Sequence, residues 1–360
     1  MPRHLKVRSS RDLGPQFTDN PHGMVGQDGA FSIPMEEGAL WFFGDTLLGR
    51  RIPGESLWYP GGVPVGHADM SGKNGIRRMI NNCGLILPAM DGRAGLRDFR
   101  YICDPAGDIR PLIPLEPDED PDWIRVWCLH GIALGPKVLL FFIKVEMLDE
   151  GPFPVNFRIL GSGLASGGSD EWNFRRILRN GASELWGAAD PHFATAVLPD
   201  PESGWIYLYG SQQQASGEQV CCLARLRPGS VEDIGSYEYL SALTPAWHRS
   251  PERAVPVFSG MPNELSVSRN AYLGQYLAVH SYNLSGDIVG RTAPAPWGPW
   301  TDPVVLWSLR SERTRPLPYP VLVYAGKEHP ELAADGGRIL YLTYIEFEEY
   351  FPHLIEVTLA

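Results

Sequence analysis

The sequence has few basic residues and no basic cluster. Its 360 residues include 31 Lys and Arg against 42 Asp and Glu, which gives a formal net charge of -11. The densest basic groups, at 49–51 and 76–79, are short. Nucleic acids and anionic membranes attract proteins through clustered Lys and Arg side chains. The composition therefore argues against both as partners.

Cysteine is also scarce, and the spacing of the cysteines does not match a disulfide framework or a zinc site. No two cysteines have C-x-x-C spacing, and the five are Cys83, Cys103, Cys128, Cys221 and Cys222. An odd number with this spacing suggests neither a disulfide framework nor a structural zinc site. We expect reduced, mostly buried thiols in a cytoplasmic protein.

Long hydrophobic runs are absent as well. The longest, VLLFFI at 138–143, is far too short to span a bilayer. The N-terminus, MPRHLKVRSSRDLG, has no apolar segment of the kind that a secretory signal needs. The sequence as written predicts a cytoplasmic protein, and a signal peptide already removed stays an open alternative.

Helical periodicity is nearly absent, and strand patterns take its place. Short runs rich in Val, Ile, Leu, Tyr, Phe and Trp are separated by Gly, Pro, Asp and Asn, which is typical of an all-β protein. The 39 Gly and 33 Pro are spread along the chain, as a fold with many turns requires.

Five strand pairs recur along the chain. They begin near Asp28, Trp127, Asp190, Asn263 and Pro320, and more polar third strands follow several of them. Units of four strands at this spacing are typical of a β-propeller. We predict one five-bladed β-propeller domain over residues 1–360, with an insertion at about 50–122 in blade one. The last strand, HLIEVTLA, is expected to complete a blade with N-terminal residues. A two-sheet sandwich is the alternative.

The first pair carries an unusual feature. Read as a hairpin that turns at Met35–Gly38, the segment FSIPMEEGALWFFGDT places Asp28 opposite Asp45. Like charges directly opposite on paired strands destabilise a sheet, so a functional role is indicated. A turn-capping role for Asp45 is the structural alternative.

Other strand pairs have polar residues near the start of their first strand. In a propeller, these residues would lie at the same end of the central channel as Asp28 and Asp45. They are His130, Asp190, His192, Glu264, Tyr324, Lys327 and His329. The result is an acidic funnel with histidines beside it. Two carboxyl groups with unequal pKa values are what glycoside hydrolysis requires. Asp190 has a turn role as its alternative, and His130 and His329 have roles as buried core histidines.

Aromatic and amide side chains are candidates for the wall of a ligand site. Those in loop-like segments are Trp58, Tyr59, Trp123 and Trp172, and Asn81 and Asn82 precede a strand. Turn formation is the alternative for both amides. The sequence contains no phosphate-binding loop, no G-x-S-x-G elbow and no H-E-x-x-H metal motif.

Several segments together resemble a known bacterial family. They are GQDGAFSIP with GALWFFGDT, MINNCGLIL, WGAADPHFATAV, NELSVSRNAYLGQYLAVHS and GRTAPAPWGPWTDP. This family, a domain of unknown function that shares the FGDT hairpin, includes endo-D-arabinanases and is similar to five-bladed propeller glycosidases. The resemblance covers nearly the whole chain, in the right order.

The resemblance implies roles for particular residues. It makes Asp45 the nucleophile and Asp28 the acid/base of a glycoside hydrolase that acts on furanosides with retention. Glu264 matches a general-acid position of the wider propeller group and is the competing acid. The places of other residues in the strand pattern, apart from the resemblance, make them the expected substrate-binding residues: Asn82, His130, Asp190, Tyr324, His329, Trp58 and Trp172.

We expect a carbohydrate or another small molecule as partner, and no cofactor or metal. An axial calcium ion beside His130 and His329 is an alternative that the resemblance allows. Two other functions stay open: a lyase, isomerase or cyclase that uses the same acidic pocket as a general base, and a sugar-binding propeller without catalysis. The oligomeric state is not predicted.

Overall fold

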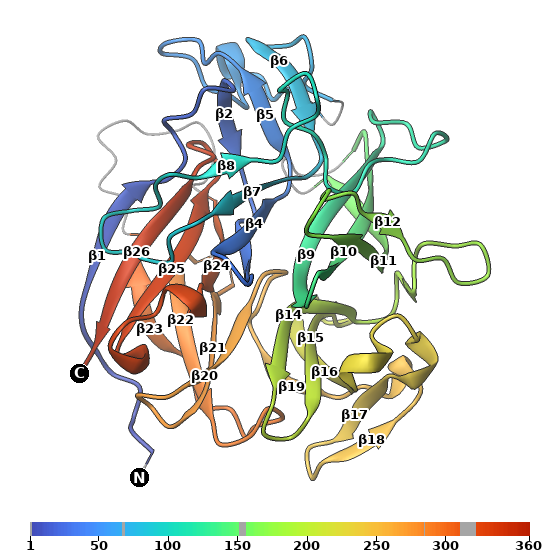
Figure 1. Cartoon of the computed structure of the whole chain (residues 1–360), viewed down its shortest axis with the longest axis vertical. Helices are drawn as coiled ribbons and strands as arrows, with labels where there is room; N and C mark the ends of the chain where they lie inside the picture. Colours follow the sequence, from blue (N-terminus) through green and yellow to red (C-terminus); the bar gives the residue numbers. More distant parts are fainter. Residues whose placement is uncertain (1, 67–68, 151–155, 284, 310–321) are drawn as a thin grey trace.

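The computed structural model describes residues 2–66, 69–150, 156–283, 285–309 and 322–360 (Figure 1). These residues contain strands and six short 3-10 helices but no α-helix, so the all-β prediction is confirmed. Residues 67–68 of the predicted insertion and 320–321 of the fifth strand pair lie outside the described part. The 3-10 helices are η1 (Pro60–Gly62), η2 (Pro228–Ser230), η3 (Ile234–Ser236), η4 (Pro251–Arg253), η5 (Pro330–Leu332) and η6 (Asp335–Gly337).

Two small sheets form the first part of the chain. The first sheet has the order β3-β4-β7-β8, and a separate three-stranded sheet, which is not counted among the first to fifth sheets, has the order β2-β5-β6. Their strands are β2 (Met24–Gln27), β3 (Phe31–Pro34), β4 (Ala39–Phe43), β5 (Thr46–Gly49), β6 (Ile76–Ile80), β7 (Cys83–Leu87) and β8 (Arg100–Tyr101). The segment 50–122 is therefore more than an insertion, because β7 and β8 are regular strands of the first sheet.

The second and third sheets follow in the chain. The second has the order β12-β11-β10-β9, with β13 also on β11. The third has the order β14-β15-β16-β17-β18, with β19 also on β16. Their strands are β9 (Ile124–Leu134), β10 (Lys137–Met147), β11 (Phe157–Gly168), β12 (Arg175–Arg176), β13 (Trp186–Gly187), β14 (His192–Asp200), β15 (Trp205–Gln213), β16 (Gln219–Leu226), β17 (Glu238–Ala242), β18 (Ala246–His248) and β19 (Pro256–Ser259).

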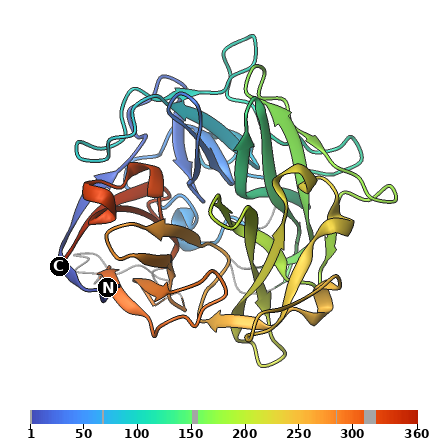
Figure 2. The same cartoon turned by 60° about the horizontal axis from the view of Figure 1, so that its bottom comes forward.

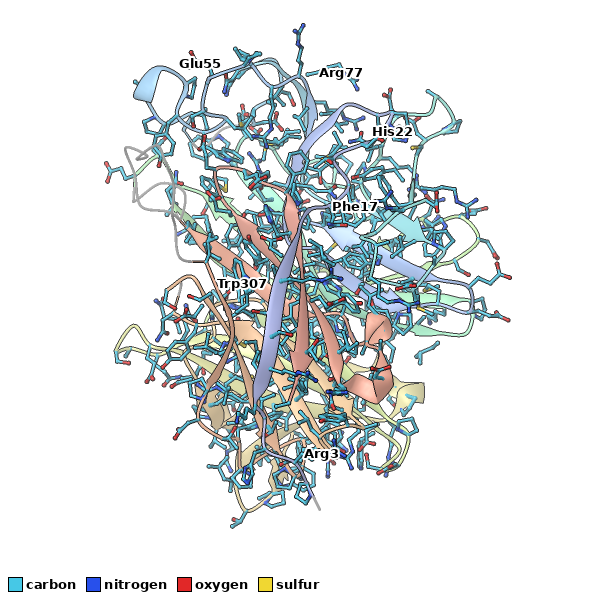
Figure 3. The ribbon with its side chains drawn as sticks, turned by 90° about the vertical axis from the view of Figure 1, so that its left-hand side faces the viewer. Arg3, Phe17, His22, Glu55, Arg77 and Trp307 are labelled. Carbon is cyan, nitrogen blue, oxygen red and sulfur yellow. The ribbon has the colours of Figure 1, made fainter. Side chains whose placement is uncertain are left out.

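The fourth and fifth sheets complete the described chain. Their orders are β20-β21-β22-β23 and β24-β25-β26-β1. Their strands are β20 (Ser266–Asn270), β21 (Gln275–Ser281), β22 (Asp287–Ala293), β23 (Val304–Ser308), β24 (Val323–Glu328), β25 (Ile339–Glu346), β26 (Pro352–Leu359) and β1 (Val7–Pro15). The N-terminal strand β1 pairs with β26, as expected for the closing strand. Figure 3 shows it crossing one side of the molecule between Arg3 and Phe17.

Each of the five strand pairs predicted from the sequence is an antiparallel hairpin. In the first, Met35 N–H donates to Gly38 O at 3.0 Å and closes the expected turn. Gly38 has a φ of +72°, a backbone conformation that L side chains rarely adopt. The turn sequence thus sets the register of the hairpin.

The core lies between successive sheets. Separate apolar clusters join the first sheet to the second, the second to the third, the third to the fourth and the fourth to the fifth. A further cluster brings Trp41 and Phe43 of β4 against Tyr341 and Leu354 of the fifth sheet. Figure 2 shows the sheets side by side around the middle of the molecule. The first strands of the five hairpins therefore face a shared central region.

Candidate active site

A cavity of about 930 Å³ opens among the sheets. Strand residues of five of the six described sheets line it, and the β20-β21-β22-β23 sheet contributes residues of its flanking segments. The lining side chains with chemistry to offer include Asp28, Asp45, Arg125, His192, Glu264 and Tyr324. Its size falls within the range of about 300–1,000 Å³ that is usual for small-molecule sites. We treat this cavity as the candidate active site.

The ladder of the first hairpin breaks where the two aspartates stand. Phe31 pairs with Phe42 in one sheet, and Gln27 pairs with Thr46 in the other. Both pairs have the predicted register, which is therefore confirmed on either side of Asp28 and Asp45. Between the sheets the regular pairing stops: Gly44 N–H and Ala30 N–H both donate to Asp28 O at 3.0 Å. Such irregularities re-aim side chains beside functional sites, and here both carboxyl groups reach the cavity.

Asp28 lies in a setting that favours its neutral form. Burial and the nearby charges of Asp45 and Glu264 raise its pKa to about 7. The hydroxyl of Tyr324 donates to Asp28 Oδ2 at 2.9 Å. Hydrogen bonds from Tyr324 and Tyr350 act in the opposite direction, because they stabilise the carboxylate. At neutral pH this carboxyl is therefore poised to hold or release a proton.

Asp45 has the guanidinium of Arg125 near it. Burial raises its pKa to about 6, and the guanidinium of Arg125 opposes the rise. The indole of Trp127 also favours the ionised form of Asp45. Within the described part of the chain, however, Trp127 Nε1 and Asp45 Oδ1 are both buried and have no hydrogen-bond partner. Asp45 thus ionises before Asp28, and one of its oxygens stays available to a ligand.

Glu264 adds a third carboxyl group to the same cavity. Burial raises its pKa, and the ammonium of Lys327 opposes that rise. Lys327 is itself 2% exposed, and burial lowers its pKa to about 8. Its ammonium donates to Gly29 O and to Ala325 O, and it lies 4.4 Å from the ring centre of Phe31. Lys327 therefore fixes the loop after Asp28, and its positive charge interacts with the carboxyl groups of Glu264 and Asp28.

Asp190 and His192 line the cavity from the third sheet. Asp190 Oδ2 accepts a hydrogen bond from Gly187 N–H at 2.9 Å, which is the turn role considered from the sequence. His192 is 7% exposed, and its Nε2 has no hydrogen-bond partner among the described residues.

Two predicted histidine sites are structural. His130 Nδ1 accepts from Val197 N–H at 2.8 Å, and its Nε2 lies 3.0 Å from Ser32 O. The imidazole thus joins three sheets in its neutral form, and burial lowers its pKa to about 4. His329 stacks on Trp41 and bonds to Ser32 and Thr343. Neither borders the cavity, so the prediction that they bind substrate is corrected.

Asn82 is also corrected to a structural role. Its amide is fully buried and makes four hydrogen bonds, all to backbone groups of Leu112, Ile113 and Val126. No group remains for a ligand. Asn81 does not border the cavity either.

The aromatic candidates divide in the same way. Trp58 lines the cavity, stacked on Phe347 at 4.8 Å with its indole N–H on Phe347 O at 2.7 Å. Trp172 packs against the cluster between the first two sheets and lies away from the cavity. Tyr59 and Trp123 do not line it either. Tyr350, which sequence reasoning missed, contacts Asp28 from the turn before β26.

The described residues contain no group of three or more His, Cys, Asp or Glu side chains arranged to hold a metal ion. The same residues include no helix with the length and apolar character needed to cross a bilayer.

The chain belongs to the family described as "Domain of unknown function (DUF4185)", which matches residues 13–356. The resemblance inferred from the FGDT hairpin is therefore confirmed. No curated protein matches the chain.

Several solved structures are similar. A presumed hydrolase from Bacteroides ovatus is 16% identical with a TM-score of 0.64, over 96% of this chain and 87% of that one. Zg3597, a family 117 glycoside hydrolase from Zobellia galactanivorans, is 10% identical with a TM-score of 0.53, over 99% and 91%. The GH43_1 enzyme from Xanthomonas citri, complexed with xylotriose, is 15% identical with a TM-score of 0.49, over 98% and 90%. The first two likenesses show a shared fold.

Proposed function

We propose that this DUF4185 protein is a glycoside hydrolase that cleaves furanosides, including chains that contain D-arabinose, with retention of configuration. The observation that carries the proposal is the Asp28–Asp45 pair. The two carboxyl groups face each other across a break in the ladder, line one cavity and have pKa values of about 7 and about 6. Unequal titration of two facing carboxyl groups separates an acid from a nucleophile.

The surroundings of each aspartate support a separate role for it in the proposal. Asp28 keeps its proton to the higher pH, so it acts as general acid and then as general base. Asp45 ionises first beside Arg125, so its carboxylate acts as nucleophile. The charge of Asp45 raises the pKa of Asp28, so the two carboxyl groups interact. Closely spaced carboxyl groups, about 5–5.5 Å apart, are what a retaining glycosidase uses, and this closeness is the support for retention.

The reaction then runs in two balanced steps. Asp28 gives its proton to the glycosidic oxygen as the bond from that oxygen to the anomeric carbon breaks, and a carboxylate oxygen of Asp45 bonds to the same carbon. Water next attacks the anomeric carbon while Asp28 takes its proton. The ester to Asp45 breaks, and both carboxyl groups return to their starting states.

The fold and substrate parts of the proposal have separate support. The cyclic packing of successive sheets supports one five-bladed β-propeller domain. The furanoside substrate rests on the FGDT hairpin and its resemblance to endo-D-arabinanases. A carbohydrate partner also suits the mixed lining of the cavity, in which apolar rings alternate with polar groups.

Hydrolysis of nitrophenyl furanosides and arabinan oligosaccharides tests the proposal. Wild type, Asp28→Asn, Asp45→Asn and Glu264→Gln are compared, with Glu202→Gln as an exposed control. We expect wild type and the control to turn over substrate, and both aspartate variants to lose this activity. NMR identifies the anomer that forms first, and we expect it to have the configuration of the substrate. Loss in Glu264→Gln alone would reassign the acid. No turnover by folded wild type would overturn the proposal and favour chemistry on another small molecule.

A further inference from the structure

The first hairpin of the third sheet shares one backbone feature with the hairpin that carries Asp28 and Asp45. In both hairpins an alanine takes a left-handed backbone conformation, with φ of +55° at Ala30 and +71° at Ala194. The register pairs Phe193 with Gly210 and His192 with Ser211. By the register of the first hairpin, Gly29 faces Gly44 and Asp28 faces Asp45.

His192 and Asp28 each stand two positions before the left-handed alanine of their hairpin. The registers differ beyond that point: the pairing of the third sheet shifts between Phe193 and Ala196, whereas the first hairpin has the same register on both sides of Ala30. Such a shift re-aims neighbouring side chains, and His192 lines the cavity. With Ser211 as its paired residue, His192 therefore stands on the third sheet where, relative to the alanine, the acid Asp28 stands on the first.

Within this pair, only His192 keeps a free position for a ligand. Ser211 Oγ donates to Asn263 Oδ1 at 3.0 Å. His192 is 7% exposed, and its Nε2 has no partner in the described part of the chain. A buried polar atom without a partner costs about 1–3 kcal/mol. Such an atom on the wall of a cavity indicates that a bound molecule completes it.

The protonation of the ring decides which kind of group fits. Burial lowers the pKa of His192 to about 4, and the nearby Ala188 backbone opposes this as a hydrogen-bond acceptor. The imidazole is neutral at pH 7, and we assign its proton to Nδ1 because the Ala188 backbone accepts from the ring while Nε2 has no partner among the described residues. Nε2 is then a lone pair that accepts a hydrogen bond. A carboxylate, a phosphate dianion or a carbonyl oxygen brings no proton to it, whereas a sugar hydroxyl does.

We propose that His192 is a specificity-determining residue whose Nε2 accepts a hydrogen bond from one substrate hydroxyl group in the cavity. The inference rests on the proposed glycoside hydrolase function and deepens it. The substrate class is one with a free hydroxyl at that position. Sites built to bond a hydroxyl reject analogues that lack it far more strongly than apolar pockets reject an altered apolar group.

The test pairs His192 variants with substrates that lack single hydroxyl groups. His192→Phe removes the acceptor, and His192→Gln keeps a polar atom near the place of Nε2. His4→Phe, the same change at an exposed position, is the matched control. The substrates are the hydrolysed furanoside of the panel and its mono-deoxy analogues. Melting temperatures of all variants are measured alongside.

We expect His192→Phe to lower kcat/KM about 10- to 100-fold on the parent substrate. Wild type loses a similar factor on one deoxy analogue, and on that analogue His192→Phe loses nothing further. His192→Gln recovers part of the activity. Unchanged kcat/KM in a folded His192→Phe would overturn this inference and leave the hydrolase standing. Equal losses on every analogue would also overturn it. Failure of wild type to cleave any sugar would overturn both proposals.

Discussion

Gly44 lies directly against the carboxyl group of Asp28. A Cβ added at position 44 would stand 2.5 Å from Asp28 Oδ1. Gly44 N–H also donates to Asp28 O at 3.0 Å. Residue 44 therefore fixes both the backbone and the side chain of the proposed acid. The glycine of the FGDT segment is required by space, since its own φ is not in the left-handed region.

Gly44→Ala is expected to impair catalysis more than folding. The added methyl group displaces the Asp28 carboxyl, and a misplacement of about 1 Å can cost roughly 100-fold in rate. We expect kcat to fall by about that factor. Gly229→Ala is the control, because a Cβ at Gly229 meets no heavy atom within 4 Å. An unchanged kcat in Gly44→Ala would contradict the placement of Asp28 as the acid.

The activity of the wild type is expected to follow a bell-shaped pH profile. Catalysis needs Asp45 ionised and Asp28 protonated, and their pKa values are about 6 and about 7. The value of kcat/KM should fall below about pH 6 as Asp45 gains a proton, and above about pH 7 as Asp28 loses its own. Because the groups interact, the two limbs report the pair. A rate that stays constant up to pH 9 would rule out Asp28 as the acid.

Tyr324→Phe is expected to move the alkaline limb to higher pH. The lost hydroxyl donates to Asp28 Oδ2 and stabilises its ionised form, so its removal raises the pKa of Asp28. Profiles of kcat/KM against pH measure the shift. Tyr272→Phe, which removes a hydroxyl bonded to Ala360 O, is the control. A shift to lower pH would show that the tyrosine does not act through the carboxylate.

Glu264→Gln should move the same limb in the opposite direction. The charge of Glu264 raises the pKa of Asp28, and the amide removes that charge while it keeps the size of the side chain. We expect the alkaline limb at lower pH, with substantial activity at pH 6. If Glu264 were the general acid instead, the variant would be inactive at every pH, which the same profiles would reveal.

The sequence predicts the Asp28–Asp45 pair because one turn sets the register over the whole hairpin. The faces of other strands were harder to assign. Asn82 and His329 look like ligand residues by type and position, yet backbone or core groups use all their hydrogen bonds. These partners are more than ten residues away in the chain. The sequence places His192 at the mouth of the propeller, but the shift in strand pairing between Phe193 and Ala196 leaves no signal in a two-residue period.

Asp28→Asn is expected to stabilise the fold while it abolishes catalysis. Burial raises the pKa of Asp28 to about 7, above the usual value of about 3.9. Between about pH 4 and pH 7 the unfolded chain has lost this proton and the folded chain keeps it, so stability falls as the pH rises. Asparagine has no proton to lose, so the cost of burying an ionised carboxylate disappears in the variant.

We expect Asp28→Asn to have a melting temperature roughly 2–4 °C above wild type at pH 8, with no difference at pH 3.5. The exposed change Asp118→Asn should show neither effect. A lower melting temperature at pH 8 would mean that Tyr324 and Tyr350 stabilise the carboxylate by more than burial costs it.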